Sequence, residues 1–492
     1  MSTRMSGLLK DIATYSFGDI LLRATTFITT PIYTRLFTPE DYGVWSYVIT
    51  ALGLLSTFLI LGCDSAYSLY YFKAKTEEEK QKVTSTALGF VALWSLTVVV
   101  LVLPFANRFS QLSFNTSQYG LLFFCALLTA PITLTNTMCG QVLRNQFQAR
   151  TFTQLNVITT LLTISLSLVG ALVFDLGITG LFVGTLIGSA IMLPVRLWKV
   201  RGMLRPVLSW PMLKKLLAYG IPLAPVGLAY WIFASSDRLV LGRLSTLEQL
   251  GLYAIGNNLT SLLAFVHSAI GQAWSPHAIR MREEQPEVAP VLFGRILTYI
   301  LVGFGILCVF YTAFAREALI IVASPAFYAA APVVGPLALG FVAYATTHIT
   351  ALGISLSGRT GYLMLYSWIS ALLNLGLNIL FVPRWGMMAA AWSTALSYVF
   401  ITVAYVITSQ RLLPVVYEKR RVFSAAGLIL LFTIAAPWLP TSNLLLTIVL
   451  KLAYCLLFIG LLFILRVFDQ REWQSVGEFW RSAQLRLTRR TA

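Results

Sequence analysis

The stretch RLFTPEDYGVW at residues 35–45 returns, in looser form, as RLSTLEQLGLY at residues 243–253. The two copies share Arg, Leu, Thr, Glu and Gly at matching positions. Two further matches follow in the same order and at nearly the same offset: Arg150-Thr151 with Arg359-Thr360, and Gly177 with Gly386. Three matches in order indicate that the chain contains an internal repeat.

The composition places this repeat in a membrane protein. Of 492 residues, 57% are hydrophobic and only 11% are charged, whereas about a quarter of a soluble protein is charged. On the criterion of about 20 apolar residues per bilayer-spanning helix, we expect about fourteen spans. Their centres are Arg23, Ser56, Trp94, Leu128, Leu162, Ile187, Leu228, Leu262, Val302, Tyr344, Ala371, Leu396, Leu430 and Phe458.

The net charge of +17 follows the expected topology and does not indicate nucleic acid as a partner. With the N-terminus in the cytoplasm, basic residues gather in inner loops, as the positive-inside rule predicts. One such loop carries Lys73, Lys75, Lys80 and Lys82, and another carries Arg196, Lys199, Arg201, Arg205, Lys214 and Lys215. Both termini are therefore expected in the cytoplasm, and the absence of a signal-peptide pattern predicts that the first helix is retained.

An internal repeat in such a protein suggests two related bundles around a central site. Each repeat unit holds six spans, an even number, so both copies have the same orientation and their pseudo-two-fold axis runs along the membrane normal. We expect an N-terminal lobe at residues 1–205, a second six-helix lobe at 206–412, and two additional helices with a cytoplasmic tail at 413–492.

The repeated motif has a structural interpretation as the outer turn between the first two helices of each lobe. Thr38 and Thr246 are expected to cap the next helix. Glu40 and Glu248 suit its positive end, and the glycine permits close packing. The alternative is direct substrate contact by Arg35 or Arg243, and the structural interpretation is favoured.

Other segments carry a family resemblance. They are Tyr15-x-x-Gly18 with PxxxRxxTPEDYG from Pro31, LGCDSAYSLYYF (61–72), VLRNQFQARTF (142–152), SSDRLVLGRLSTLEQLGLYAIGNNL (235–259) and LLNLGLNILFVPRWGMMAAAWSTALSYV (372–399). Their order over roughly residues 10–410 resembles Wzx-type oligosaccharide flippases of the MATE-like (MOP) flippase superfamily. The resemblance implies two six-helix lobes and two C-terminal helices.

The resemblance also implies a function in the bacterial inner membrane. It implies movement of an undecaprenyl-diphosphate-linked glycan from the inner to the outer leaflet by alternating access, for O-antigen, exopolysaccharide or capsule synthesis. The expected partners are the lipid-linked oligosaccharide, membrane lipids, a coupling Na⁺ or H⁺, and a glycan polymerase or glycosyltransferases. No cofactor is expected.

Charges within or beside spans are the candidate site residues, because such charges are costly unless they face a cavity or a partner. A polar stripe on the first helix includes Asp19 and Arg23, which can pair at i and i+4. Either the stripe forms a cavity wall, or the two residues form a buried ion pair that only orients the helix. We expect the cationic substrate contacts to come from Arg23, Arg144, Arg150, Arg238, Arg359 and Lys451. For each loop arginine singly, the topological explanation is favoured, and Lys451 can equally snorkel.

Candidates for ion coupling are Asp19, Asp64, His267 and His348. For Asp64 a structural pairing with a neighbouring arginine is favoured, and for each histidine a hydrogen-bonded packing role is favoured. No HxxxH or HExxH spacing predicts a metal site. Helix-breaking residues predict hinges or static bends at Gly220, Pro222, Pro225 and Pro31.

Two other classes remain as alternatives. A cation-coupled drug antiporter of the same superfamily fits the hydropathy, but the extra helix pair and Arg23 count against it. A membrane polymerase or ligase would carry a long external loop with arginine and histidine. The longest external stretch expected here, around residues 107–118, is short; Arg108 is its one arginine, and it has no histidine. No catalytic arrangement is evident, so we do not expect an enzyme.

Overall fold

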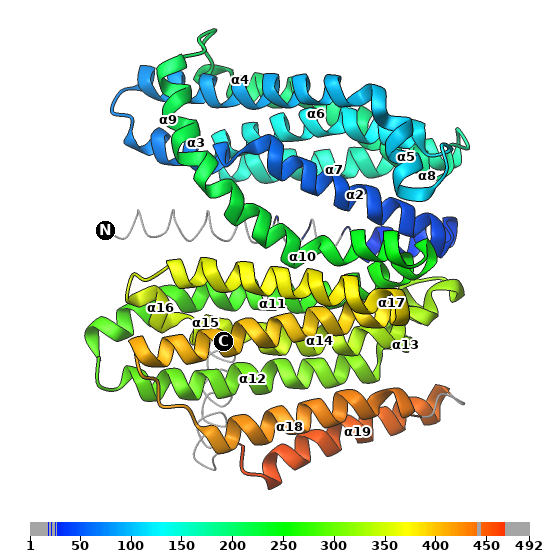
Figure 1. Cartoon of the computed structure of the whole chain (residues 1–492), viewed down its shortest axis with the longest axis vertical. Coiled ribbons are helices and arrows are strands. Elements are labelled where there is room, and N and C mark those ends of the chain that lie inside the picture. The colour runs from blue at the N-terminus through cyan, green and yellow to red at the C-terminus, as the bar shows by residue number, and fades with distance from the viewer. Residues whose placement is uncertain (1–17, 19–20, 22–24, 26, 440–443, 468–492) are drawn as a thin grey trace, which may run out of the picture. The chain divides into compact units, whose positions relative to one another are not determined.

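The computed structural model describes residues 18, 21, 25, 27–439 and 444–467. Within these residues the chain is almost entirely helical and contains no strand, as Figure 1 shows. Eleven helical segments are long and apolar enough to cross a membrane. The prediction of an all-α protein with many membrane-spanning helices is confirmed.

The eleven segments correspond closely to the expected spans. Helix α11 (Leu247–Glu284) contains the expected centre Leu262 but is not among the eleven. Helix α17 (Gly361–Leu412) contains two expected centres, because the non-helical residue Gly386 divides it. Counting α11 and both parts of α17, the described helices hold thirteen of the fourteen expected spans. The remaining centre, Arg23, lies outside the described residues.

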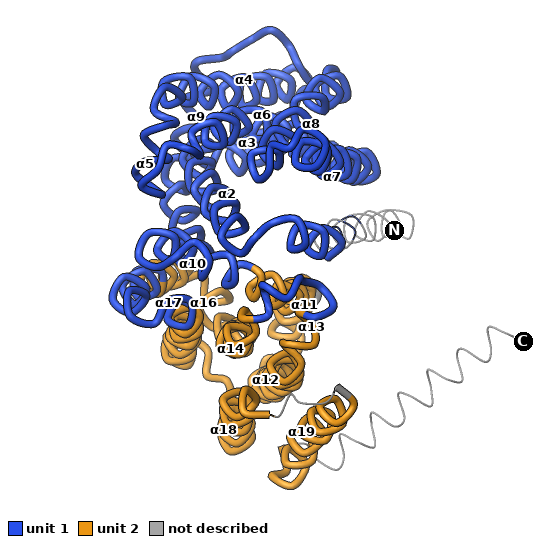
Figure 2. The backbone as a smooth tube through the Cα atoms, turned by 90° about the vertical axis from the view of Figure 1, so that its right-hand side faces the viewer, with its two compact units in different colours: residues 1–254, 320–328, 371–390 blue, residues 255–319, 329–370, 391–492 orange. Residues whose placement is uncertain are grey.

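The Cα positions group into two compact units, coloured in Figure 2. Unit 1 comprises residues 1–254, 320–328 and 371–390, and unit 2 comprises the rest. Helices α11, α13 (Ala315–Val322) and α17 contribute to both units. The six-helix lobes bounded at residues 205 and 412, and the axis relating them, stay predictions.

Two helices of unit 1 begin at clear sequence signals. Thr38 caps α2 with a reciprocal capping box to Asp41, and Thr76 caps α4 above three glutamates in the first turn; both arrangements satisfy orphan backbone donors. The helices lying wholly within the unit are α2 (Pro39–Ile60), α3 (Cys63–Lys73), α4 (Glu77–Val102), α5 (Ala106–Phe114), α6 (Gly120–Asn145), α7 (Ala149–Leu172), α8 (Gly177–Val200), α9 (Trp210–Gly220) and α10 (Ala224–Leu244).

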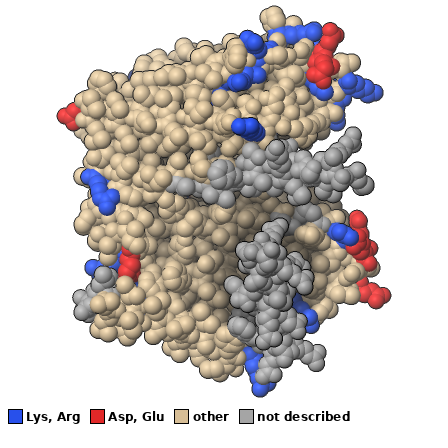
Figure 3. Space-filling view, turned by 180° about the vertical axis from the view of Figure 1, so that it is seen from behind, with Lys and Arg blue, Asp and Glu red and all other residues tan. Residues whose placement is uncertain are grey.

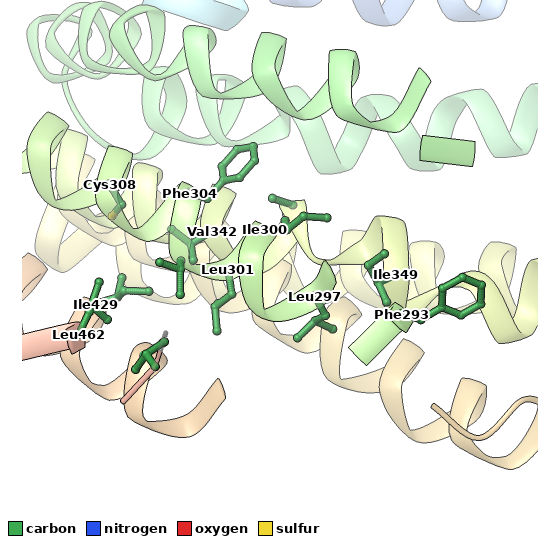
Figure 4. Close-up of a cluster of buried hydrophobic side chains, with 14 of the residues drawn as sticks. Phe293, Leu297, Ile300, Leu301, Phe304, Cys308, Val342, Ile349, Ile429 and Leu462 are labelled. Carbon is green, nitrogen blue, oxygen red and sulfur yellow. The ribbon is translucent and has the colours of Figure 1, made fainter. Parts of the chain in front are cut away.

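Unit 2 is organised around α12, whose apolar face carries much of one buried cluster (Figure 4). Phe293, Leu297, Leu301 and Cys308 project from α12, and the cluster extends to α14, α18 and α19. The other helices contributing to this unit are α13 (Ala315–Val322), α15 (Thr347–Thr350) and α16 (Leu352–Leu356). The bounds of the cluster helices are Ala289–Ala313 for α12, Ala331–Ala345 for α14, Lys419–Ala435 for α18 and Leu444–Ile464 for α19.

The repeated motif forms helix starts in both copies. The Thr38 hydroxyl accepts a hydrogen bond from the Asp41 amide at 3.2 Å, and the Thr246 hydroxyl accepts one from the Gln249 amide at 3.2 Å. Glu40 and Glu248 lie in the first turns of α2 and α11. The capping role expected of the motif is confirmed for both copies.

The glycines of the two motif copies lie against each other within unit 1. A Cβ on Gly43 would lie 1.9 Å from the Leu247 carbonyl oxygen, and a Cβ on Gly251 would lie 1.8 Å from the Pro39 carbonyl oxygen. Each copy therefore contacts the start of the other in the same way, which is the reciprocity of a two-fold relation.

The two repeat-equivalent glycines, Gly177 and Gly386, also have similar backbone φ angles. Gly177, at the start of α8, has φ +54°, and Gly386, at the break in α17, has φ +53°. This left-handed region favours glycine, because a Cβ is strained there. The matched glycines therefore serve the same kind of turn.

Two interrupted helices cross in unit 1. Leu61 and Gly62 adopt left-handed conformations between α2 and α3. A 3₁₀ segment, η3 (Ile221–Leu223), separates α9 from α10 just after Gly220. A Cβ on Gly62 would lie 2.4 Å from the Gly220 carbonyl oxygen, so the two breaks touch backbone to backbone.

Charged side chains are sparse on the face shown in Figure 3, most of which is formed by other residues. Exposed leucine, isoleucine, valine and phenylalanine side chains are numerous along the long helices, and Leu101, Phe423 and Leu456 are examples. An exterior of this kind suits a lipid environment and not water.

Candidate functional site

The described residues contain most, but not all, of the expected site. Asp19 and Arg23, with most of the polar stripe around them, lie outside the described residues. Pro31 lies within helical residues 27–36, and its carbonyl oxygen accepts a hydrogen bond from the Arg35 guanidinium at 2.9 Å. The helix therefore continues through Pro31 up to Leu36.

A cavity of about 480 Å³ lies in unit 1 beside the crossing of the interrupted helices. Asp64, in the first turn of α3, lines it together with Tyr230 and Trp231 of α10. Among the described residues, the Asp64 carboxylate has no ion-pair or hydrogen-bond partner. The rest of the wall is small or apolar: Thr57, Ile60, Gly62, Ser65, Leu223, Ala224, Val226, Gly227, Ala234 and Ser235.

The hinge candidates lie at the helix interruption beside this cavity. Gly220 is the last residue of α9, Pro222 lies within η3, and Pro225 is the second residue of α10. Proline at these places removes backbone donors that a continuous helix would need. The interruption is present in the structure, whereas a hinge motion about it stays a prediction.

The expected arginines at the α6–α7 turn are exposed. Arg144 lies in the last turn of α6 with its guanidinium 4.4 Å from the Phe152 ring centroid, a cation–π arrangement. Arg150 is exposed in the first turn of α7. In unit 2, Arg359 is exposed just before α17, the repeat-equivalent place. Neither Arg150 nor Arg359 is ion-paired with a described carboxylate.

Two neighbouring buried residues of α10, Ser236 and Asp237, make separate sets of polar contacts. Asp237 is 6% exposed, and its carboxylate accepts hydrogen bonds from the Tyr253 hydroxyl and from the Arg238 amide, the latter at 2.7 Å. Asn378 donates to the Asn374 side-chain oxygen at 3.0 Å, and Ser236 lies 3.4 Å from that same oxygen. Hydrogen bonds offset the cost of burying this carboxylate.

Arg238 follows Asp237 on the same helix and is half-buried. Asn378 keeps one buried side-chain oxygen without a hydrogen-bond partner. Side-chain oxygen atoms are ligands for hard cations such as Ca²⁺ and Mg²⁺. The separation of Ser236 and Asn374 in the sequence makes their contact hard to predict, although asparagines inside an apolar span are a visible signal.

The structure differs most from the sequence interpretation at Arg196. Hydropathy predicts an inner loop at this residue, but Arg196 lies inside α8 and is 4% exposed. Its guanidinium donates to the Asn156 side-chain oxygen at 2.8 Å, the Thr159 hydroxyl at 2.9 Å and the Asn136 carbonyl oxygen at 3.3 Å. It therefore links α8 to α6 and α7 through neutral acceptors.

Among the described residues, His267 and His348 are the predicted site residues that the structure brings together from distant parts of the sequence. Their ring centroids lie 4.1 Å apart with planes 24° from parallel, and His267 also stacks on Tyr344 at 4.6 Å. Nε2 of His348 lies 2.9 Å from the His267 carbonyl oxygen. Nε2 of His267 is buried without a hydrogen-bond partner.

Lys451 on α19 is 3% exposed and does not snorkel to the surface. Its Nζ lies 2.7 Å from both carboxylate oxygens of Glu317 on α13. The pair joins α19, the last helix among the described residues, to the rest of unit 2. To bind a diphosphate, Lys451 would have to leave the Glu317 carboxylate. Within the described residues, no group of histidine, cysteine and carboxylate side chains is arranged to hold a metal ion.

Solved structures with the same fold are membrane transporters. The lipid II flippase MurJ in an inward closed conformation has a TM-score of 0.72 at 14% identity, covering 91% of this chain and 98% of that chain. An inward-facing multidrug resistance MATE family transporter of the MOP superfamily has a TM-score of 0.58 at 16% identity, covering 78% and 92%. A MOP superfamily transporter from Pyrococcus furiosus gives 0.53 at 15%, covering 82% and 95%.

At these identities the likeness establishes the fold alone, which is that of the MurJ and MATE transporters. The family model of polysaccharide biosynthesis proteins matches residues 32–332, more than half of the chain. The chain belongs to this family of polysaccharide biosynthesis proteins. A comparison with curated proteins finds no match.

Proposed function

We propose that this protein moves a lipid-linked oligosaccharide, carried on undecaprenyl diphosphate, from the inner to the outer leaflet of a bacterial inner membrane. The observation that carries the proposal is the match to polysaccharide biosynthesis proteins across residues 32–332, in a chain with the fold of the MurJ flippase. Family and fold together support transport of a glycan precursor. The glycan would feed O-antigen, exopolysaccharide or capsule synthesis.

The arginines at the repeat-equivalent turns are proposed to capture the anionic headgroup. Arg150 opens α7 and Arg359 precedes α17, and both are exposed. A guanidinium presents a planar fork of donors that matches phosphate oxygens. With the N-terminus in the cytoplasm, these turns face the leaflet where the lipid-linked intermediate is made.

Alternating access is the proposed mechanism, because a rocking repeat unit exposes one site to each side in turn. The crossing of the two helix breaks at Gly62 and Gly220 gives unit 1 a place to bend. A coupling Na⁺ or H⁺ is proposed at buried or cavity-lining groups, with Asp64 and the His267–His348 pair as candidates. A glycan polymerase and glycosyltransferases are the proposed neighbours in the membrane.

The test is a flipping assay in proteoliposomes with a fluorescent undecaprenyl-diphosphate-linked oligosaccharide. We expect purified protein to equilibrate the probe between leaflets. Arg150→Ala and Arg359→Ala should each slow the process roughly tenfold, because each removes charge-assisted hydrogen bonds. Arg201→Ala is the matched control, since Arg201 is an exposed arginine in η2 (Arg201–Met203) outside the repeated turns. Movement of cationic dyes with no movement of the lipid-linked probe would contradict the proposal.

The cavity in unit 1 favours a second candidate, a transporter of organic cations. Its carboxylate, Asp64, stands beside the aromatic rings of Tyr230 and Trp231, a combination that binds ammonium groups by charge and cation–π attraction. The same proteoliposomes would report this activity by uptake of a fluorescent quaternary ammonium dye. Loss of that uptake in Asp64→Asn, with the lipid-linked probe unmoved by wild type, would establish the second function in place of the first.

A further inference from the structure

We infer that His267 and His348 form a single proton-binding site, which takes up one proton and not two. This inference rests on the proposed function only for its consequence in transport. The geometry that carries it lies entirely within unit 2, where α15 and α11 meet.

The position of His348 is fixed by its neighbours. A Cβ on Gly271, one turn beyond His267 on α11, would lie 2.2 Å from Cε1 of the His348 ring. Gly271 therefore leaves a notch in α11 that receives the imidazole. His348 itself lies in α15, a short segment between the interrupted ends of α14 and α16. The ring is held against α11 by a segment that is not part of a continuous helix.

The contact between His348 and the His267 carbonyl oxygen shows which ring nitrogen of neutral His348 carries hydrogen. The His267 carbonyl oxygen can only accept, so Nε2 of His348 carries hydrogen and donates across the 2.9 Å contact. In neutral His348 the lone pair is then on Nδ1. A proton binds to that lone pair or to the unprotonated ring nitrogen of His267, and in either case the donor contact to the carbonyl persists.

A second proton is opposed by the first. Two imidazolium rings stacked 4.1 Å apart would place like charges in direct contact, and interacting groups at this range titrate as a pair. The other titratable groups in ring contact are Tyr344 of α14 and, behind it, Tyr398 of α17. Among the described residues, no carboxylate, lysine or arginine makes a hydrogen bond or ion pair with either imidazole.

The proton-loaded pair has a consequence for transport. A charge within a membrane-spanning segment is costly unless water or an opposite charge reaches it. Uptake of the proton therefore favours a conformation in which the α11–α15 contact is open to water or to an anionic headgroup. Release of the proton favours the closed, stacked arrangement.

The chain suits a direct test because it contains only three histidines, His267, His277 and His348. Full-length protein labelled with ¹⁵N-histidine in lipid nanodiscs would be titrated by NMR, with signals assigned by single His→Gln variants. His277 is exposed on α11, and its signal serves as the reference. We expect the other two to change together and to take up one proton in total.

Two variants sharpen the test. Gly271→Ala fills the notch and displaces the His348 ring while keeping both imidazoles, so the two should titrate independently. If that variant does not fold, His348→Gln should leave His267 titrating alone. Uptake of two protons by the wild-type pair, or no titration of either ring between about pH 4 and 9, would overturn the inference.

The flipping assay separates this inference from the proposed function. If the pair couples transport to protons, the pH dependence of flipping should flatten in His267→Gln and His348→Gln and persist in His277→Gln. A wild-type protein that moves no lipid-linked probe at any pH would remove the proposed function, while the one-proton titration would still stand on the NMR data.

Discussion

Gly43 and Gly251 meet back to back, each in the opening turns of a helix that begins with the same motif. A Cβ on Gly43 would lie 3.2 Å from the Gly251 amide nitrogen, and a Cβ on Gly251 would lie 3.0 Å from the Gly43 amide nitrogen. Only hydrogen fits on either α-carbon. The two copies of the motif therefore touch each other, and each side of the contact requires glycine.

Replacing either glycine should destabilise the protein. Gly43→Ala and Gly251→Ala each place a methyl group into backbone atoms, and overpacking of this kind costs about 1–3 kcal/mol. The midpoint of thermal unfolding in detergent would measure the effect. Gly303→Ala is the control, because Gly303 lies exposed in α12 with open space around its α-carbon. Equal midpoints for all three variants would show that the close contact is absent.

The two glycines with positive φ should respond differently to the same change. Gly177→Ala meets open space, so it costs only backbone strain of about 1–2 kcal/mol. Gly386→Ala adds a clash, because its Cβ would lie 1.6 Å from the Gln249 side-chain oxygen that accepts from the Met387 amide at 3.0 Å. We expect the unfolding midpoint of Gly386→Ala to fall further. The reverse order would contradict the contact with Gln249.

Replacing one partner of the buried Lys451–Glu317 pair should destabilise the protein more than replacing both. Lys451→Met or Glu317→Gln alone leaves an uncompensated buried charge, at a cost of about 3–5 kcal/mol, whereas the double variant should recover much of the loss. Urea unfolding followed by tryptophan fluorescence would give the double-mutant cycle. The exposed Lys80–Glu77 pair provides the comparison, since surface pairs contribute about 0–1 kcal/mol. Additive single effects would argue against the prediction.

Replacing Arg196 by lysine should destabilise the protein. The ammonium group of Arg196→Lys cannot reproduce three directed contacts to α6 and α7, so we expect a loss of about 1–3 kcal/mol from acceptors left unpaired. Arg201→Lys, at an exposed position in η2, should be neutral. Limited proteolysis of membranes carrying each variant would compare them. Matching cleavage rates would mean that the guanidinium contacts add no stability.

The sequence predicted the local part of the fold well. Caps at Thr38 and Thr246 and the turn glycines Gly177 and Gly386 depend on residues near them in the chain, so their signals are readable without a structure. The all-α class follows from span-length apolar runs. These expectations are confirmed because bilayer thickness and backbone hydrogen bonding leave helices few alternatives.

The candidate site was predicted less completely, because its contacts join distant residues. His267 and His348 were named singly, and nothing in their spacing indicated that the rings stack. Hydropathy predicts a loop at Arg196 because it counts the charge and takes no account of the hydrogen bonds that Asn156 and Thr159 accept. The sequence does not distinguish snorkelling from ligand binding at Lys451, because its partner Glu317 lies on a separate short helix.

The ion pair between α13 and α19 also constrains how this chain can change over evolutionary time. Glu317 is neutralised by Lys451 of α19, the final described helix. A related protein that had lost this helix would keep the Glu317 carboxylate buried without a partner. Loss of the terminal segment and replacement of residue 317 should therefore occur together. Among related genes, the identity of residue 317 should reveal whether the last helix is still present.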